Sequence, residues 1–523
     1  MQTINELLGT SVKKYSNHPA LLEPVEGSRI ATLTYRTLQE RVQGFAGYLQ
    51  AQGLEKGNCI VIWSASRADW MIAYLGALLL GVIVVPLDVN SREDFLKRVV
   101  ETTEAKLLIT TQKQYTSLKK TTLPLVDIDA LPQETLDTGK LPVVHSYDLA
   151  EVVFTSGTTG QPKGVMLTHA NITSNARAAV RVVNIQASDR ALSILPLSHM
   201  FELTIEIALL SSGASIVYAR SLAPETLLRL MSTQHVTCMV LVPQALQLFL
   251  NGIEREVRRQ KKEKQFEQLL KIASYLPFGW RRLLFRSVHK RFGGHFRFFV
   301  SGGAYLPPTL AQKWENMGFR VMQGYGATEC APVISVTPYT EHTFGSVGKP
   351  LPRVEVRLAD DHEILVRGPN VACGYWKNSE ATAAVFQDGW YHTGDLGEMD
   401  AQGDLYLKGR KKNLIVLANG LNVYPEDIEN ILQAHPLVKD AVVLGLTEQG
   451  QGPEVHAVLL MDDPGKVKEA VQQTNKQLAA HQQIRGFTVW SGEDFPRTHT
   501  LKVKRQDVLD RLPQLRQKAK ADR

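Results

Sequence analysis

Residues 150–164 read AEVVFTSGTTGQPKG, a strand pattern followed at once by a loop of glycines, hydroxyl side chains and one lysine. The three glycines let the backbone approach a bulky anion closely, and the four hydroxyls can donate hydrogen bonds to phosphate oxygens. The loop is not a Walker A motif, because Pro162 stands where that motif needs glycine followed by Lys-Ser/Thr. The pattern predicts a phosphate-binding loop with the ligands Thr155, Ser156, Gly157, Thr158, Thr159 and Lys163.

The sequence before and after this loop alternates between strand and helix patterns. Cys59–Trp63 and Val82–Leu87 read as buried strands, and a helix pattern near Arg92–Thr103 precedes a further strand at Lys106–Thr110. Similar alternation recurs from Ala191 to about Val300. Such alternation predicts a parallel sheet covered by helices on both faces.

The pattern changes twice toward the C-terminus. Short strands between glycine turns over 362–408 indicate a β-rich subdomain. Beyond Gly409 a new pattern begins, with a helix opened by Pro425, strands near 438–446 and 455–461, and a helix over Lys466–His481. We expect an α/β protein: a large N-terminal domain (1–409) of stacked α/β layers with a β-rich subdomain, and a small mobile α+β C-terminal domain (410–523).

Composition fits a cytoplasmic globular protein. Hydrophobic residues make up 44% of the chain and charged residues 21%, which is ordinary globular usage. The four cysteines lie far apart without metal-type spacing, so we expect reduced thiols. The N-terminus lacks a basic segment followed by a long apolar one, so no secretory signal is evident. The apolar run Trp70–Val85 is shorter than the ~20 residues of a membrane span, and we expect a buried helix leading into a buried strand.

Residues 250–292 concentrate positive charge. They hold twelve arginines and lysines against four glutamates, whereas the whole chain has a net charge of +7. Eleven apolar residues, among them Tyr275 and Trp280, follow the basic run. A basic amphipathic helix with interfacial aromatics can lie on an anionic membrane, so peripheral membrane contact through residues 253–290, on the inner face, is one hypothesis. A solvated surface helix packed on its own domain is the other.

The loop TSGTTGQPKGV resembles the phosphate loop of the adenylate-forming superfamily of acyl-CoA synthetases, adenylation domains and luciferase-like enzymes. The family's other motifs follow in order, so the resemblance extends from about Thr34 to Arg505. It implies ATP and Mg²⁺ as cofactors. The segment of Gly302, Gly303 and Ala304 resembles the glycine-rich segment beside adenine and the acyl carbonyl.

Residues 324–329, GYGATE, resemble the family's YGxTE motif. Between Gly324 and Gly326, Tyr325 offers an aromatic face on which adenine can stack. Thr328 can donate a hydrogen bond to the α-phosphate. Glu329 offers the hard oxygen ligand that Mg²⁺ prefers, so it is both the metal ligand and a catalytic candidate.

The resemblance assigns further residues near the C-terminus. Asp395 in YHTGD matches the aspartate that accepts hydrogen bonds from both ribose hydroxyls, and Arg410 matches an arginine that also reaches the ribose. Lys412 matches the hinge residue, although the next position, often acidic in the family, is Asn413. Lys502 matches the catalytic lysine that neutralises charge as the adenylate forms; Leu501 replaces the usual glycine before it, and Lys504 is the alternative register.

The implied reaction has two halves. A carboxylate attacks the ATP α-phosphate to give acyl-AMP and pyrophosphate, and then the small domain rotates and a thiol displaces AMP. Gly420 would line the tunnel for the thiol arm. CoA is the favoured co-substrate; an acyl carrier protein shares every motif and stays open as a partner. Nucleic-acid recognition has no support beyond charge, so no nucleic-acid partner is expected.

The acid is less determined by the sequence. Residues 195–202, LPLSHMFE, resemble the acyl-pocket entry of fatty acyl-CoA synthetases, with His199 as a gate, and favour a medium- or long-chain fatty acid. Phe201-Glu202 also falls where amino-acid adenylation domains place a phenylalanine–aspartate pair, so an amino- or aryl-acid adenylating enzyme is the alternative. A non-catalytic acyl or nucleotide sensor is a remote one, since such a protein need not keep Lys502.

Overall fold

The computed structural model describes residues 2–25, 29–118, 123–155, 162–340, 342–417, 419, 421–447, 453–497 and 503–521, and for residues 517–521 the backbone alone. The chain forms two compact units: Met1–Val356 with Val366–Tyr391, and Arg357–Leu365 with His392–Arg523. The mixed α/β class with a large and a small part is confirmed. The expected boundary at residues 409 and 410 stays a prediction, because packing alone does not tell which residues would rotate as one body.

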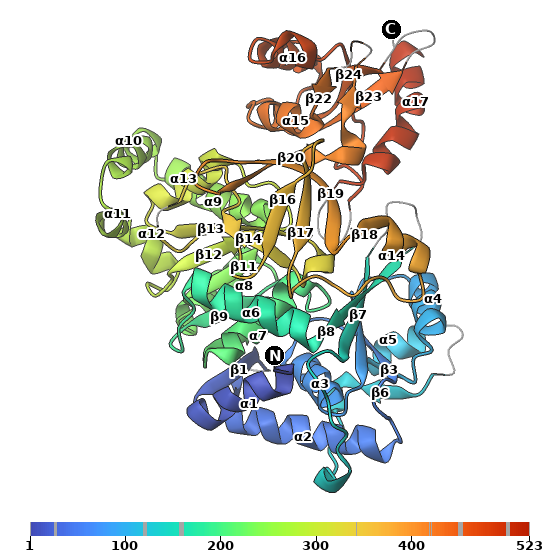
Figure 1. Ribbon diagram of the computed structural model, residues 1–523. Coiled ribbons are helices and arrows are strands. Elements are labelled where there is room, and N and C mark those ends of the chain that lie inside the picture. The colour runs from blue at the N-terminus through green and yellow to red at the C-terminus, as the bar shows by residue number, and fades with distance from the viewer. Residues whose placement is uncertain are drawn as a thin grey trace. The chain divides into compact units, whose positions relative to one another are not determined.

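The first unit contains a six-stranded sheet (Figure 1). Its order is β6-β5-β3-β4-β7-β8, and the strands are parallel except for the antiparallel pair β7 and β8. The strands span Leu125–Asp127 (β6), Leu107–Thr110 (β5), Cys59–Trp63 (β3), Ile83–Leu87 (β4), Leu149–Thr155 (β7) and Lys163–Thr168 (β8).

A nine-stranded sheet forms the other half of this unit, in the order β15-β14-β13-β12-β11-β9-β10-β1-β2. The first strand of the chain, β1, lies parallel to β10, with Leu21 opposite Ile216. The strands span Lys349–Pro350 (β15), Val333–Val336 (β14), Arg320–Gly326 (β13), Phe298–Ser301 (β12), Cys238–Leu241 (β11), Arg190–Ser193 (β9), Ser215–Tyr218 (β10), Pro19–Pro24 (β1) and Ile30–Thr34 (β2).

Both sheets are buried on both faces, as the alternation of their side chains shows. Along β3, Ile60 and Ile62 join one core, whereas Cys59, Val61 and Trp63 join another that includes Leu96 of the helix Glu93–Thr103. Along β11, Val240 joins the same first core while Met239 and Leu241 face a third. Since successive strand residues point to opposite faces, the first core lies between the two sheets, and the layers are stacked as expected.

Helices α1, α2, α3, α6 and α7 contact one another and supply the layer within that shared core. They span Ile4–Tyr15, Tyr35–Ala51, Ala68–Leu79, His169–Val183 and Met200–Ser211. Almost every residue of α3 is buried, which explains the apolar run that begins at Trp70. Within the described part of the chain, no helix is long and apolar enough to cross a membrane.

The remaining helices of the first unit cover the outer faces of the sheets. Beside the six-stranded sheet these are α4 (Glu93–Thr103) and α5 (Gln112–Ser117). Beside the nine-stranded sheet they are α8 (Pro224–Thr233), α9 (Pro243–Arg259), α10 (Glu263–Ser274), α11 (Phe278–Leu284), α12 (Arg286–Arg291) and α13 (Pro308–Asn316). The unit also contains α14 (Ser379–Val385) and β18 (Phe386–Gln387).

Short strands form the segment predicted to be β-rich; the prediction assigned it to the large domain, whereas most residues of these strands pack in the second unit. They are β16 (Glu355–Leu358), β17 (Glu363–Arg367), β19 (Trp390–Met399) and β20 (Leu405–Arg410), and β20 pairs with β19. The three-stranded sheet β23-β24-β25 (Val438–Thr447, Pro453–Met461 and Gly486–Val489) and the pair β21 (Ile415–Val416) and β22 (Asn422–Val423) follow. The helices are α15 (Pro425–Gln433), α16 (Val467–Asn475) and α17 (Arg505–Ala521).

One helix is shorter than the sequence predicts. The helix expected over Lys466–His481 ends at Asn475, so that expectation is wrong for its last turn and a half. The Asn475 side chain donates to the carbonyl of Ile484 at 3.1 Å and accepts from its amide at 2.9 Å. These bonds replace helical backbone bonds and fold the chain back.

Candidate active site

The phosphate-loop motif connects two antiparallel strands of the first unit. Thr155 ends β7, Lys163 begins β8, and the two residues lie opposite each other in the strand pair. The Thr155 hydroxyl donates to the Lys163 carbonyl at 3.5 Å. The predicted ligands Ser156, Gly157, Thr158 and Thr159 lie outside the described residues. The motif therefore has strands on both sides, unlike a Walker A loop, which leads into a helix.

The two glycine-containing motifs follow or end neighbouring parallel strands. Gly302, Gly303 and Ala304 come directly after β12, and β13 ends at Gly326, with Ser301 opposite Gln323. Gly303 has a φ of +79°, a conformation that favours glycine. A Cβ on Gly326 would lie 1.8 Å from the Pro332 carbonyl oxygen, so the backbone approach there requires glycine.

Other close contacts define the neighbourhood of these motifs. A Cβ on Gly302 would lie 3.0 Å from the Phe201 ring and 3.3 Å from the carbonyl oxygen of Gly324. Tyr325, within β13, is buried. The structure thus brings Phe201, Gly302 and Gly324 together at the carboxyl ends of parallel strands, where ligands bind in open α/β sheets.

Thr328 and Glu329 lie in a 3₁₀ turn, Thr328–Cys330, that follows β13. The Tyr375 hydroxyl donates to Oε1 of Glu329 at 2.8 Å, and the Lys163 ammonium lies 5.0 Å from the centre of the Tyr375 ring. Burial, and then the charge of Glu329, raise the pKa of Tyr375. Tyr375 therefore links the lysine of the phosphate loop to the predicted Mg²⁺ ligand.

Sequence reasoning missed Tyr375. Its segment extends β8 through backbone bonds, with Val165 bridging to Tyr375 and the Trp376 amide donating to the Gly164 carbonyl at 2.7 Å. More than 200 residues separate it from the loop that it adjoins, and no motif marks it. Within the described residues no three His, Cys, Asp or Glu side chains converge as a metal cage. A single carboxylate nonetheless fits Mg²⁺, which keeps several waters and binds through phosphates.

His199 and Glu202 stand at the start of α7. His199 is its N-cap residue, and its backbone amide donates to the Pro196 carbonyl at 3.0 Å. Glu202 is buried, and burial together with neighbouring Glu206 raises its pKa well above the usual value. Burial also raises the pKa of Glu206 to about 7, although the Tyr218 hydroxyl donates to it at 2.7 Å. The Glu202 carboxyl thus lies in the core beside a second carboxyl.

The two residues assigned to the ribose form a pair in the second unit. Asp395 of β19 lies opposite Arg410 of β20, and Arg410 Nε lies 2.6 Å from Oδ1 of Asp395. The Asp395 amide donates to the Thr393 hydroxyl at 3.0 Å. The carboxylate is thus held by the strand pair and by a cation.

Lys412 and Asn413 follow directly, in the 3₁₀ turn Lys411–Asn413. Burial, and then Arg410 and Arg505, lower the pKa of Lys412. Asn413 Nδ2 donates to Glu426 at 3.0 Å, so the amide at this departure from the family pattern still contacts a carboxylate.

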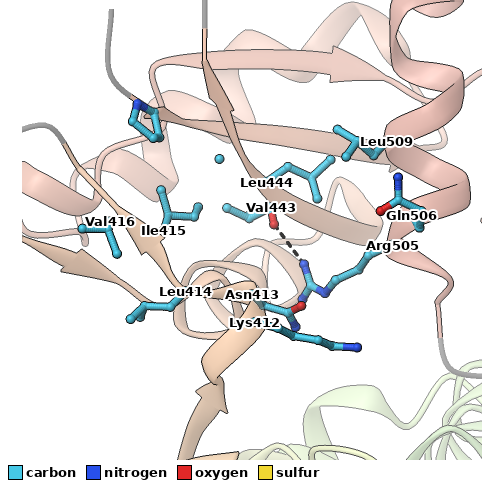
Figure 2. A pocket seen from close by; sticks show the side chains of 12 residues that line it. Lys412, Asn413, Leu414, Ile415, Val416, Val443, Leu444, Arg505, Gln506 and Leu509 are labelled. Carbon is cyan, nitrogen blue, oxygen red and sulfur yellow. Dashed lines mark hydrogen bonds between the residues drawn. The ribbon is translucent and has the colours of Figure 1, made fainter. Parts of the chain in front are cut away.

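A small pocket of about 270 Å³ adjoins this turn (Figure 2). Its lining includes Lys412, Ile415, Leu509 and Arg505. The Arg505 guanidinium donates to the Val443 carbonyl at 2.9 Å, the dashed line in Figure 2, and contacts Glu429 at 2.5 Å. Arg505 therefore joins helix and sheet within the second unit.

Two predicted residues near the C-terminus, Lys502 and Gly420, lie outside the described residues. The flanks of Lys502 are described: Arg497 bridges to Val503, and the Lys504 amide donates to the Pro496 carbonyl at 2.8 Å. The two ends of the lysine segment thus lie side by side.

Comparison with known proteins places the chain in a family. Residues 8–376 match the AMP-binding enzyme family, and residues 412–515 match the AMP-binding enzyme C-terminal domain. The chain belongs to the AMP-binding enzyme family. It is an adenylate-forming enzyme related to acyl- and aryl-CoA ligases.

Curated relatives differ in the acid that their names state. A long-chain-fatty-acid–CoA ligase of Mycobacterium bovis is 29% identical, covering 88% of this chain and 87% of its own. A 2-succinylbenzoate–CoA ligase of Bacillus licheniformis is 30% identical, and the match covers 87% of this chain and 90% of the relative. Among solved structures, O-succinylbenzoate coenzyme A synthetase from Bacillus subtilis with AMP has a TM-score of 0.79 at 26% identity. The match covers 97% of this chain and 98% of that structure. ATP-bound MatB from Rhodopseudomonas palustris has a TM-score of 0.80 at 25% identity, and the match covers 97% of this chain and 99% of that structure.

Proposed function

We propose that this protein converts a medium- or long-chain fatty acid to its acyl-CoA through an acyl-AMP intermediate, with release of AMP and pyrophosphate. The contact of Tyr375 with both Lys163 and Glu329 is the observation that best supports the adenylating half. Tyr375 lies between Lys163, the cation proposed to bind the phosphates, and Glu329, the carboxylate proposed to bind Mg²⁺.

In the first half-reaction, an oxygen of the fatty carboxylate attacks the α-phosphorus of ATP, and the bond to the β-phosphate oxygen breaks. We assign the β- and γ-phosphates to the loop Thr155–Lys163, and Mg²⁺, which would neutralise phosphate charge when bound, to Glu329. Tyr325 would stack on adenine, with Gly302, Gly303, Ala304, Gly324 and Gly326 allowing close backbone approach. Thr328 would donate to the α-phosphate, and Lys502 would offset the charge that develops there.

The second unit would hold the ribose and supply the thiol step. Asp395, which Arg410 contacts at 2.6 Å, would accept hydrogen bonds from the ribose hydroxyls, since a carboxylate only accepts and both hydroxyls can donate. Lys412 would be the hinge, and rotation there would remove Lys502 and bring Gly420 to the thiol path. The sulfur of CoA then attacks the acyl carbon, and AMP leaves.

The acid class rests on the acyl-pocket residues. Phe201 packs against Gly302, and an aromatic ring suits an apolar chain. Because burial and Glu206 favour the neutral form of Glu202, this carboxyl is a poor partner for a substrate ammonium group. That disfavours an amino acid. An aryl acid is the second candidate, since a 2-succinylbenzoate–CoA ligase is among the relatives.

Mass spectrometry of products from purified protein would test the proposal. The protein is incubated with ATP, Mg²⁺ and a panel of fatty, aromatic and amino acids, with and without CoA, and reactions without ATP are the control. A fatty acyl-CoA that forms only with CoA supports the proposal. An aryl-CoA would transfer the assignment to the second candidate, and acyl-AMP without thioester would favour an acyl carrier protein as acceptor. If no acid gives an adenylate, the proposed adenylating activity is refuted.

A further inference from the structure

Helices α10 and α11 lie at the outer edge of the first unit in Figure 1. Apolar side chains on them, and at the C-cap of α10, face solvent. Tyr275 is 82% exposed, Trp280 62%, Leu283 60% and Ile272 53%. They fall within twelve residues: Ile272 lies on α10, Tyr275 is the C-cap residue of α10, and Trp280 and Leu283 lie on α11, which contacts α10. Single exposed apolar residues are ordinary, but a group that includes the most exposed of the seven tryptophans, all of them described, calls for a partner.

The helical period separates this group from the core of the unit. Phe266, Leu269, Leu270 and Ala273 pack inward against the core beside the nine-stranded sheet. At 100° per residue, the opposite side of α10 holds Lys264, Gln268, Lys271, Ile272 and Tyr275. Four of the five apolar residues of α10 therefore pack against the core of their own unit. The outward side of the helix is what remains for a partner.

That side is strongly basic. Among the described residues, no carboxylate lies within 4.0 Å of the ammonium groups of Lys261, Lys262, Lys264 or Lys271. Some other cations of the segment are engaged: Arg282 donates to two carbonyls at 3.0 and 2.7 Å, and Arg259 pairs with Glu256. Of the glutamates of α10, Glu263 lies on the flank of the helix, and Glu267 lies about 70° from the centre of the outward side, as far as Ile272 on the opposite edge. One carboxylate therefore borders a side that carries Lys264 and Lys271 at its centre.

We propose that the α10–α11 surface, defined by Lys261, Lys264, Lys271, Ile272, Tyr275, Trp280 and Leu283, docks on the surface of an anionic lipid bilayer. Lysines attract acidic headgroups, and tyrosine and tryptophan suit the interface, where one end of the side chain is apolar and the other wet. The lysines and the exposed aromatics together match an anionic bilayer, whose interface binds both kinds of side chain. A protein partner can also bury tryptophan and tyrosine, so it is an outcome of the tests below. The inference does not depend on which acid the enzyme activates.

Vesicle flotation with the full chain tests the charged part of the surface. Wild-type protein is expected to float with phosphatidylcholine vesicles that contain phosphatidylglycerol and to stay behind with pure phosphatidylcholine. Each lysine near an anionic surface contributes about fivefold in partitioning, so the change Lys261→Glu, Lys264→Glu, Lys271→Glu should weaken binding at least about 100-fold. The control reverses three other exposed lysines: Lys13→Glu, Lys113→Glu and Lys468→Glu. Equal losses in both variants would attribute binding to net charge and overturn the proposal.

The apolar part is tested by Trp280 fluorescence. Brominated anionic lipids should quench the emission of the wild type, and Trp280→Phe should lose most of that quenching. A second variant, Tyr275→Ser with Leu283→Ser, should bind more weakly than a control with Tyr147→Ser and Leu222→Ser, two other exposed apolar residues. If the wild-type protein binds no anionic vesicle, the proposal that this surface docks on a bilayer is refuted. It is also refuted if a surface variant converts a dimer to a monomer in sedimentation, because the surface would then bind a second copy of the chain.

Discussion

The hydroxyl of Tyr375 offers the sharpest test of the candidate site. The change Tyr375→Phe removes the 2.8 Å hydrogen bond to Glu329 and keeps the ring over which the Lys163 ammonium lies. A hydrogen bond to a charged group contributes about 1.5–3 kcal/mol, and loss of a group that orients a metal ligand typically weakens the metal about 10- to 100-fold. If Glu329 binds Mg²⁺, we expect the apparent Mg²⁺ affinity to fall by about that factor.

The assay is acid-dependent exchange of labelled pyrophosphate into ATP, measured over a range of free Mg²⁺ at saturating ATP and fatty acid. The variant should need more Mg²⁺ and should recover most of its rate when Mg²⁺ saturates. Tyr115→Phe is the control, because that hydroxyl belongs to a partly buried tyrosine of the first unit and donates at 3.3 Å to the Leu123 carbonyl, away from the motifs. Tyr375→Leu, which also removes the ring, should lose more activity than Tyr375→Phe.

An unchanged Mg²⁺ requirement in folded Tyr375→Phe would refute the reasoning that this hydroxyl orients the metal ligand. A rate that falls equally at every Mg²⁺ concentration would refute it too, because the defect would then lie outside metal binding. Circular dichroism and thermal unfolding of all variants separate these outcomes from misfolding.

Three further predictions concern other parts of the chain. Lys502→Ala should abolish acyl-AMP formation and retain thioester formation from supplied acyl-AMP, whereas Lys504→Ala should retain both; loss of both steps in the first variant would count against the assignment. Gly302→Ala places a Cβ 3.0 Å from the Phe201 ring, so kcat/KM should fall several-fold more for long acids than for short ones in a chain-length series. Burial raises the pKa of Glu151 to about 8, so its folded form keeps a proton that the unfolded chain loses near pH 4.5, and folding stability is lost as the pH rises between these values. Glu151→Gln should therefore raise Tm relative to wild type more at pH 9 than at pH 5, and an equal shift at both would contradict this burial argument.

The sequence predicts well what is local or strictly periodic. The strand before Thr155 and the buried run from Trp70 were expected, because both are mainly apolar segments bounded by turn residues. The end of the helix at Asn475 was not, since it depends on contacts with Ile484, nine residues away. The role of Tyr375 was not predicted for the same reason, because Tyr375 contacts Glu329 only in the folded structure.

Solvent exposure was also beyond the sequence. The basic segment shows both lysines and apolar residues, but only packing separates Leu269, which faces the core, from Tyr275, which faces water. Conversely, the motif at Gly326 was identified without knowledge of the carbonyl that leaves no room for a Cβ. The sequence therefore indicates which residues are candidates, and non-local contacts supply their neighbours.

The pairing of β1 with β10 affects how the chain can fold during synthesis. The strand β2 pairs with one edge of β1 soon after β1 is made, but Leu21 lies opposite Ile216 at the other edge, so that edge waits for nearly two hundred further residues. At about 5–20 residues per second, that wait is on the order of 10–40 s. Until then the buried side of β1, and the helices that share its core, lack the packing that β10 supplies. We therefore expect the early segments to expose apolar surface during synthesis, and we expect the refolding rate to be limited by this long-range closure rather than by helix formation.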